Sequence, residues 1–123
     1  MARVRFAPCP SSPNCVSTKA PTDDTEHRAE PIAFSGDVDA AMAAVLGALE
    51  GLKRTTIAER DDRYVRAVVS SAVFRFKDDV EFEVDADAQQ IHYRSASRVG
   101  HSDLGVNRKR TDGLRATIAD QLA

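Results

Sequence analysis

The chain has 123 residues, of which 42% are hydrophobic and 29% are charged, and its formal net charge at pH 7 is -2. This length and composition are typical of one globular domain with a modest core. The charge balance argues against a protein that binds the nucleic acid backbone, because such a protein needs a net basic face. No apolar run approaches the roughly 20 residues that cross a bilayer, so we expect no membrane span.

The N-terminal segment, residues 1–34, contains all five prolines. Proline fixes φ and lacks a backbone donor, so we expect an irregular arm, with a flexible part near residues 23–28. The segment has no apolar stretch of the kind found in a signal peptide. The sequence as written therefore predicts a cytoplasmic protein, or an exported one if a signal has been removed from it. Residues 35–123 are expected to form a single α+β domain against which the arm packs.

The first helix is predicted over residues 37–52. Apolar residues recur there at steps of three and four, which is the pattern of a helix that buries one face. Ser35 or Asp37 can cap its start, since a side-chain oxygen at that position accepts from a free backbone N–H. The buried stripe is predicted to contain Val38, Met42, Val45, Leu49 and Leu52.

Residues 53–95 are predicted to form an antiparallel meander of about four to five strands. The ranges 53–59 and 64–70 carry the β-branched residues that strands favour. The range 80–85 alternates between apolar and acidic residues, and such alternation marks a strand with one buried face. A strand at 90–95 follows it.

A short loop would pair the last two of these strands in one antiparallel register. Apolar residues then face each other on one side, and acidic residues face basic ones on the other side, which we expect to be solvated. The predicted pairs are Val84 with Ile91, Phe82 with Tyr93, Glu81 with Arg94, and Glu83 with His92.

A second helix is predicted from Val106 to Leu122, with Leu114 and Ile118 on its buried stripe. The order of elements is then arm, helix, meander, helix. The simplest packing places both helices on one face of the sheet. The predicted fold is therefore an α+β two-layer sandwich with an irregular N-terminal arm.

Two cysteines, Cys9 and Cys15, lie in the proline-rich arm with five residues between them. A disulfide between them would close a small loop and stabilise the protein by about 2 kcal/mol on the chain-entropy model. The spacing differs from the Cys-x-x-Cys of redox enzymes and from zinc knuckles, so we expect neither a metal nor a cofactor. A structural disulfide, two free thiols, and a redox or metal role remain as alternatives.

The start of the second helix carries three cations, Arg108, Lys109 and Arg110. Positive charge there opposes the helix dipole, at roughly 0.3–1 kcal/mol per exposed charge, so a negative group should compensate it. A bound anion is one candidate, because the free N–H groups of a helix start and arginine side chains bind phosphate, sulfate or carboxylate. The internal candidates are Asp78, Asp79, Asp103 and Asp112.

These patterns lead to three functional hypotheses. The first is a binding or accessory domain whose pocket accepts a small anion or an acidic ligand. The second is an enzyme that uses the same pocket, with a Cys9 thiolate or an Asp79 carboxylate as its reactive group. The third is a structural protein–protein module with an exposed apolar patch and no pocket. The predicted pocket contains Arg94, Ser97, Arg98, Arg108 and Arg110, with Asp79 and Asp103 orienting the arginines.

Three motifs, in this order, resemble one known family. They are Cys9-Pro-Ser-Ser-Pro-Asn-Cys-Val-Ser17, Phe76-Lys-Asp-Asp-Val-Glu-Phe82, and the run from Arg94 to Arg110, Arg-Ser-Ala-Ser-Arg-Val-Gly-His-Ser-Asp-Leu-Gly-Val-Asn-Arg-Lys-Arg. Together they resemble the domain-of-unknown-function family DUF1499 of bacteria and plastids, over nearly the whole chain. The resemblance implies no activity and no catalytic residues, because the family has none assigned. Many members are similar to exported, lipid-anchored or thylakoid-lumen proteins, which favours a disulfide between Cys9 and Cys15.

Overall fold

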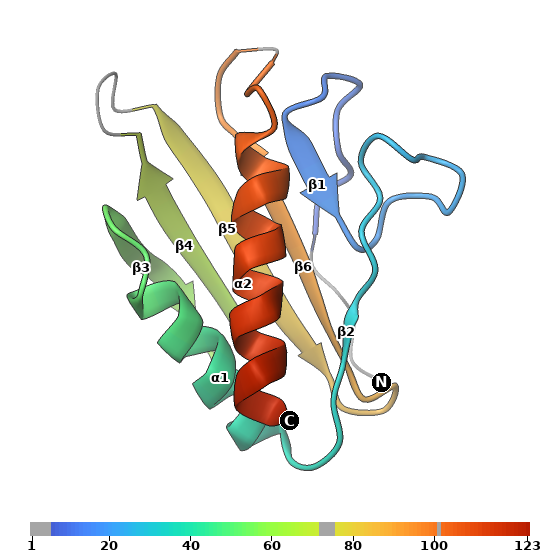
Figure 1. Ribbon diagram of the computed structural model, residues 1–123, viewed down its shortest axis with the longest axis vertical. Helices are drawn as coiled ribbons and strands as arrows, with labels where there is room; N and C mark the ends of the chain where they lie inside the picture. Colours follow the sequence, from blue (N-terminus) through green and yellow to red (C-terminus); the bar gives the residue numbers. More distant parts are fainter. Residues whose placement is uncertain (1–5, 72–75, 101) are drawn as a thin grey trace.

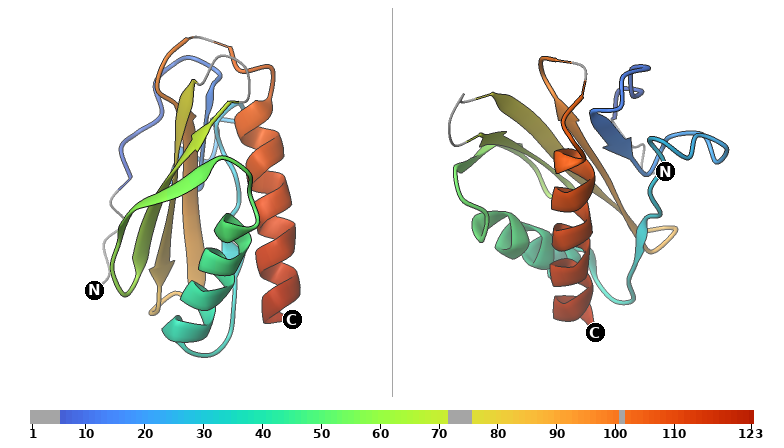
Figure 2. Two further views of the ribbon diagram at one scale, coloured as in Figure 1. Left: turned by 90° about the vertical axis from the view of Figure 1, so that its left-hand side faces the viewer. Right: turned by 45° about the horizontal axis from the view of Figure 1, so that its top comes forward.

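The chain folds as two layers, a six-stranded antiparallel sheet and two helices that pack on one of its faces (Figures 1 and 2). The computed structural model describes residues 6–71, 76–100 and 102–123. Its elements are β1 (Cys15–Ser17), β2 (Ile32–Ala33), α1 (Val38–Glu50), β3 (Thr55–Arg60), β4 (Tyr64–Ser70), β5 (Lys77–Asp85), β6 (Gln90–Ser97) and α2 (Val106–Leu122). None of these helices combines the length and the apolar composition needed to cross a membrane. The predicted α+β sandwich is confirmed.

The four strands from β3 to β6 form a meander, and the N-terminal arm completes the sheet. Both β1 and β2 pair with the outer edge of β6, in antiparallel register. The prediction of an irregular arm was therefore wrong for these two short segments. The two strands cover the edge of β6, which would otherwise present a row of free N–H and C=O groups. The prolines of the arm lie outside both strands.

Each helix begins where the sequence predicts. Asp37 caps α1, where its Oδ1 accepts a hydrogen bond from the Ala40 amide at 2.7 Å. The bounds of α2 match the prediction, and Leu114 and Ile118 are buried. Two polar side chains of α2, Asn107 and Thr111, are buried as well.

The predicted register of the last two strands is confirmed at all four pairs. On the helix side, Phe82 and Tyr93 lie opposite each other across the strands, with ring centroids 5.7 Å apart and ring planes tilted by 39°. The core between sheet and helices is mostly aliphatic. Its fully buried members include Val45, Leu49, Val65, Val80, Val84, Ile91 and Ile118.

The face of the sheet opposite the helices differs from the prediction. We expected the carboxylates of β5 to be solvated, yet Glu81 and Glu83 are only 9% and 4% exposed. The N-terminal arm runs along this face (Figure 2), and the Pro8 carbonyl accepts a hydrogen bond from Arg94 Nη2. Alternation identified the polar side of β5 correctly. It could not show that a segment seventy residues away in sequence covers that side.

Candidate functional site

The segment from Arg94 to Arg110 leaves β6, crosses a turn and enters α2. Successive side chains of a strand point to opposite faces of the sheet. Arg94 and Arg98 accordingly lie on the face away from the helices, where Arg98 binds Asp79, whereas Ser95 contacts Asn107 of α2 on the other face. The predicted arginine set is thus divided between two sides of the sheet.

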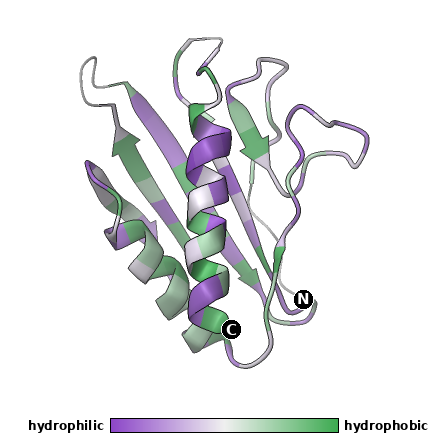
Figure 3. Ribbon diagram, in the orientation of Figure 1, coloured by the Kyte–Doolittle hydropathy of each residue, from purple (hydrophilic) through white to green (hydrophobic). Residues whose placement is uncertain are grey.

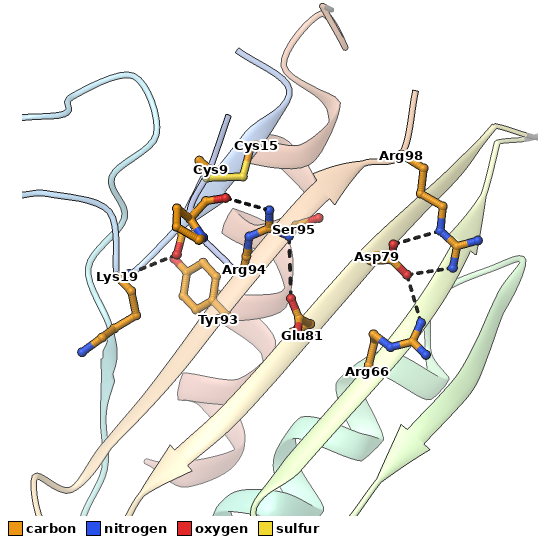
Figure 4. Close-up of polar contacts among 12 residues, drawn as sticks. Cys9, Cys15, Lys19, Arg66, Asp79, Glu81, Tyr93, Arg94, Ser95 and Arg98 are labelled. Carbon is orange, nitrogen blue, oxygen red and sulfur yellow. Dashed lines mark hydrogen bonds and ion pairs between the residues drawn. A yellow bond between two sulfur atoms is a disulfide. The ribbon is translucent and has the colours of Figure 1, made fainter. Parts of the chain in front are cut away.

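Arg98 is engaged by a carboxylate of the neighbouring strand (Figure 4). Its Nε donates to Asp79 Oδ2 and its Nη2 to Asp79 Oδ1, both at 2.9 Å. Arg66 Nη1 donates to the same Oδ1 at 3.1 Å. The hydrogen bonds and charge of Arg98 lower the pKa of Asp79, and the same pairing raises the pKa of Arg98. Asp79 therefore orients Arg98, and it is a poor proton acceptor.

Arg94 lies deeper on the same face, beneath the arm (Figure 4). Its Nη1 is 3.7 Å from Glu81 Oε2, and the other oxygen of Glu81 accepts a 2.6 Å hydrogen bond from Tyr64. Burial and this hydrogen bond raise the pKa of Tyr64. The Nε of Arg94 is buried and has no hydrogen-bond partner among the described residues. Arg94 is thus held between the sheet and Pro8, away from open solvent.

Arg110 is neutralised on the helix side of the sheet. Its Nη2 lies 2.8 Å from Asp78 Oδ2, and both side chains are 12% exposed. Its Nη1 donates to Ser95 Oγ and to Asn107 Oδ1. Part of the cationic charge at the start of α2 is therefore compensated by a carboxylate of the chain itself.

Asp103 compensates the helix start in a second way. Its Oδ1 accepts from the Gly105 amide at 2.8 Å, and its Oδ2 accepts from the Asn107 amide at 3.0 Å and from Asn107 Nδ2 at 2.6 Å. Burial acts to raise the pKa of Asp103, but these hydrogen bonds outweigh it and lower that pKa. Ser97 Oγ also accepts from Asn107 Nδ2, at 3.0 Å. Asp103 therefore satisfies a free amide in the first turn of α2, whose N-cap residue is Gly105, and it orients Asn107, not an arginine.

Arg108 points to the arm. Its Nη1 and Nη2 donate to the main-chain carbonyls of Arg28 and Glu26, at 2.9 and 3.0 Å. This contact attaches α2 to the arm. The structure therefore does not bring Arg94, Arg98, Arg108 and Arg110 into one pocket, because strand alternation and internal partners separate them.

The two reactive groups of the enzyme hypothesis, the Cys9 thiolate and the Asp79 carboxylate, are both engaged by other groups. Cys9 and Cys15 form a disulfide, with Cα atoms 5.7 Å apart, so Cys9 has no thiol in this state. Asp79 is bound by two guanidinium groups, as described above. Elsewhere in the described ranges, no three histidine, cysteine or acidic side chains converge as ligands for a metal ion.

A groove that the sequence analysis missed opens on the helix side of the sheet, where α2 begins. Its volume is about 1000 Å³. The floor comes from the adjoining ends of β4, β5 and β6, and the walls come from the chain after α1, the turn after β6 and the first turns of α2. Four apolar side chains in its lining are exposed to solvent: Phe76 (54%), Val99 (57%), Leu104 (95%) and Val106 (47%).

The rim of this groove is basic. Lys53, Arg54 and Lys109 line it, and none of them forms an ion pair with a carboxylate in the described part of the chain. Arg54 Nε donates only to the Ser70 carbonyl, at 3.1 Å. Figure 3 shows that hydrophilic residues predominate in the first turns of α2. The groove thus combines an apolar interior with unneutralised positive charge.

The sequence contains one signal for this groove. Val99, Leu104 and Val106 are apolar residues in or beside a turn, outside the buried stripe of α2. Their number in so short a segment indicates an exposed apolar patch. The cations between Arg94 and Arg110 favoured the prediction of an arginine pocket instead. The approach of Phe76 and Lys53 to the same place depends on the tertiary fold and leaves no trace in the local pattern.

Comparison with known proteins agrees with the motifs. No curated protein matches the chain. The model of one protein family, described as "Protein of unknown function (DUF1499)", matches residues 5–118. That match includes the disulfide, all six strands and most of α2. The chain therefore belongs to the DUF1499 family.

Proposed function

We propose that this protein is a binding domain whose groove takes a ligand with an apolar body and an anionic group. The observation that carries the proposal is the position of the exposed large hydrophobic residues. All four in the described part of the chain, Phe76, Val99, Leu104 and Val106, line this one groove. An exposed apolar patch with a polar rim is typical of a binding surface.

The rim charges define the second half of the ligand. Lys53 and Arg54 lie on one wall and Lys109 on the other, and no described carboxylate neutralises them. A ligand that carries an anionic group can pair with them while its apolar part covers Leu104. The proposal keeps the anion of the original hypothesis and moves its site from the arginine set to the groove. It also includes the apolar patch that the protein–protein hypothesis requires.

An anionic aromatic dye tests this function. 8-Anilinonaphthalene-1-sulfonate fluoresces when its rings enter an apolar site, and it carries one sulfonate. We expect saturable binding to the folded protein and displacement by dodecanoate. Leu104→Ser should weaken binding about tenfold, because burial of a leucine contributes roughly 1.5–3 kcal/mol. Lys109→Gln should weaken it by up to about fivefold, since an exposed ion pair contributes up to about 1 kcal/mol.

Lys19→Gln is the matched control, because Lys19 is an exposed lysine of the arm that does not line the groove. It should bind the dye as the unaltered protein does. Near-ultraviolet circular dichroism checks that every variant keeps its native packing, since partly unfolded proteins also bind this dye. Equal dye binding by the unaltered protein and Leu104→Ser would rule out the groove as the site.

A further inference from the structure

We infer that the natural occupant of the groove is an acidic amphipathic helix of a partner protein. This inference rests on the proposed function and names its ligand. The groove lies in the helix layer of the sandwich. One wall follows the end of α1 and the other is the start of α2, while the floor is the sheet. In Figure 1, α1 crosses one end of the sheet and α2 runs along β5 and β6, so the upper part of β4 has no helix over it.

Exposure of the apolar side chains favours a large occupant over a small molecule. Small-molecule sites enclose most of their ligand. Leu104 is 95% exposed, so its side chain projects beyond the groove and is not part of an enclosing wall. A segment with its own bulk can cover Leu104 and fill the space next to Val99 and Val106 at the same time. A helix that lies in a groove makes such contacts through residues spaced at i, i+3, i+4 and i+7.

The polar residues of the groove favour a protein segment over a lipid surface. Asp78 and Asp103 line the same groove as the apolar residues. The lowered pKa of Asp103 keeps its carboxylate charged. Both carboxylates have partners within the chain, Arg110 for Asp78 and Asn107 for Asp103, and hydrocarbon over them would remove water from these charges, which is costly even for paired ions. A helix covers the apolar residues with its apolar stripe and leaves these polar groups beside its solvated flanks.

The cations of the groove indicate that the partner is negatively charged. The unneutralised cations stand on both walls, with Lys53 and Arg54 after α1 and Lys109 on α2. Aspartate or glutamate on both flanks of the apolar stripe of a helix would face them. Such complementarity increases specificity and the rate of association.

The anchor of this interface is already in place before binding. Leu104 has φ of 56°, a left-handed conformation that leucine rarely adopts. Its amide donates to Ser102 Oγ at 3.3 Å, and the next amide, of Gly105, donates to Asp103 Oδ1. These contacts hold the turn that presents the side chain. A side chain held in its bound position reduces the entropy lost on association.

Selection from a displayed peptide library tests the inference. The library holds helical peptides of about four turns, roughly 15 residues, with random charge on the flanks of an apolar stripe. The unaltered protein is the target, and the Leu104→Asp variant removes peptides that bind elsewhere. Because Leu104 is exposed, this variant should fold normally. We expect enrichment of peptides with apolar residues at i, i+3 or i+4, and i+7, flanked by aspartate and glutamate.

The charge pattern is then tested on one selected peptide. Lys109→Glu should weaken its binding about tenfold, because it removes an attractive charge and adds a repulsive one. Exchange of the facing acidic residue of the peptide for lysine should restore affinity to Lys109→Glu. Lys19→Glu, a charge reversal on the exposed arm, should leave affinity unchanged.

Three outcomes would overturn the inference. They are the absence of enrichment over the Leu104→Asp variant, enrichment of basic peptides, and strong binding to phosphatidylcholine vesicles with one quarter phosphatidylglycerol in place of any peptide. The last outcome would identify a membrane as the occupant. In each case, dye binding that depends on Leu104 would leave the proposed binding function intact, whereas loss of dye binding would remove both.

Discussion

Asn107, in the first turn of α2, donates a hydrogen bond from its Nδ2 to the main-chain carbonyl of Asn14, 93 residues earlier in the chain, at 3.2 Å. Its side chain is fully buried. The same amide group contacts Ser97 and Asp103, and its oxygen accepts from Ser95 at 2.6 Å. A single side chain therefore joins the arm, β6 and the turn that forms one wall of the groove.

Replacement of Asn107 by alanine should destabilise the protein by about 2–3 kcal/mol, because it leaves several buried partners without a hydrogen bond. The free energy of unfolding in urea measures this loss. Lys109→Ala, an exposed position two residues along the same helix, is the control and should change stability by less than about 0.5 kcal/mol. Similar stability of the two variants would contradict the role given to Asn107.

His27 fastens the middle of the arm. Its Nδ1 lies 2.7 Å from Asp24 Oδ2 and its Nε2 lies 2.8 Å from the Ser12 carbonyl oxygen. Both partners are acceptors, so the protonated ring satisfies both contacts. Burial acts to lower the pKa of His27, but the Ser12 carbonyl and the charges of Asp24 and Glu26 outweigh it, and the pKa is raised. The hydrogen bond to His27 lowers the pKa of Asp24.

The raised pKa of His27 predicts a pH dependence of stability. A folded-state pKa above the unfolded value adds stability that is complete below the unfolded pKa of about 6.5 and is lost as pH rises through the folded value. We expect the free energy of unfolding of the unaltered protein to fall as pH rises above about 6.5. His27→Gln should lack this component. Parallel plots of unfolding free energy against pH for the two proteins would contradict the prediction.

The lowered pKa of Asp79 predicts that stability depends on pH in the opposite direction in acid. The hydrogen bonds of Arg98, joined by those of Arg66, lower its pKa. This pairing contributes stability that is present above the unfolded pKa of about 4 and is lost as pH falls through the lower, folded value. Asp79→Asn should therefore be less stable than the unaltered protein at pH 7, and the difference should shrink in acid. Thermal unfolding at several pH values measures it.

The Asp79 prediction has a matched control on the same strand face. Asp85→Asn also removes a carboxylate from β5 but touches neither Arg66 nor Arg98. In acid, the stability of Asp85→Asn should follow that of the unaltered protein more closely than the stability of Asp79→Asn does. If the difference in stability between Asp79→Asn and the unaltered protein stays constant down to pH 2, the ion pairs of Asp79 do not cause it.

The sequence predicted those features that depend on neighbours in the chain. The alternation of Val80, Phe82 and Val84 was enough to predict the register with β6, and the capping residue and apolar stripe were enough to predict α1. Each of these patterns is local, and a shift by one residue would bury charge in the core.

The candidate site was harder to predict, because its parts meet only in the fold. Period-two alternation could have separated Arg94 and Arg98 from Ser95 and Ser97, since these residues alternate along one strand. It could not show that Asp78 reaches Arg110 or that Arg108 turns to the carbonyl of Arg28. These contacts join segments far apart in sequence, and they neutralise or engage cations that seemed to lack partners.

The Cys9–Cys15 disulfide gives the last prediction. It closes a small loop, and the chain-entropy model assigns such a loop about 2 kcal/mol. The Cys9→Ser, Cys15→Ser double variant should lose about this much in free energy of unfolding in urea. A reductant should lower the stability of the unaltered protein to that of the double variant. It should have no effect on the double variant itself, which controls for other actions of the reductant.

The disulfide also holds the arm over the opposite face of the sheet. Arg94 Nη2 donates to the carbonyl of Pro8, the residue before Cys9. Release of the loop should free this contact, so the backbone amides of Cys9, Ser11, Ser12 and Asn14 should exchange with solvent faster, while those of α2 beyond Leu114 should not change. Hydrogen exchange measures both regions in one sample. Unchanged exchange in the loop after reduction would mean that His27 and Asn107 alone suffice to hold the arm.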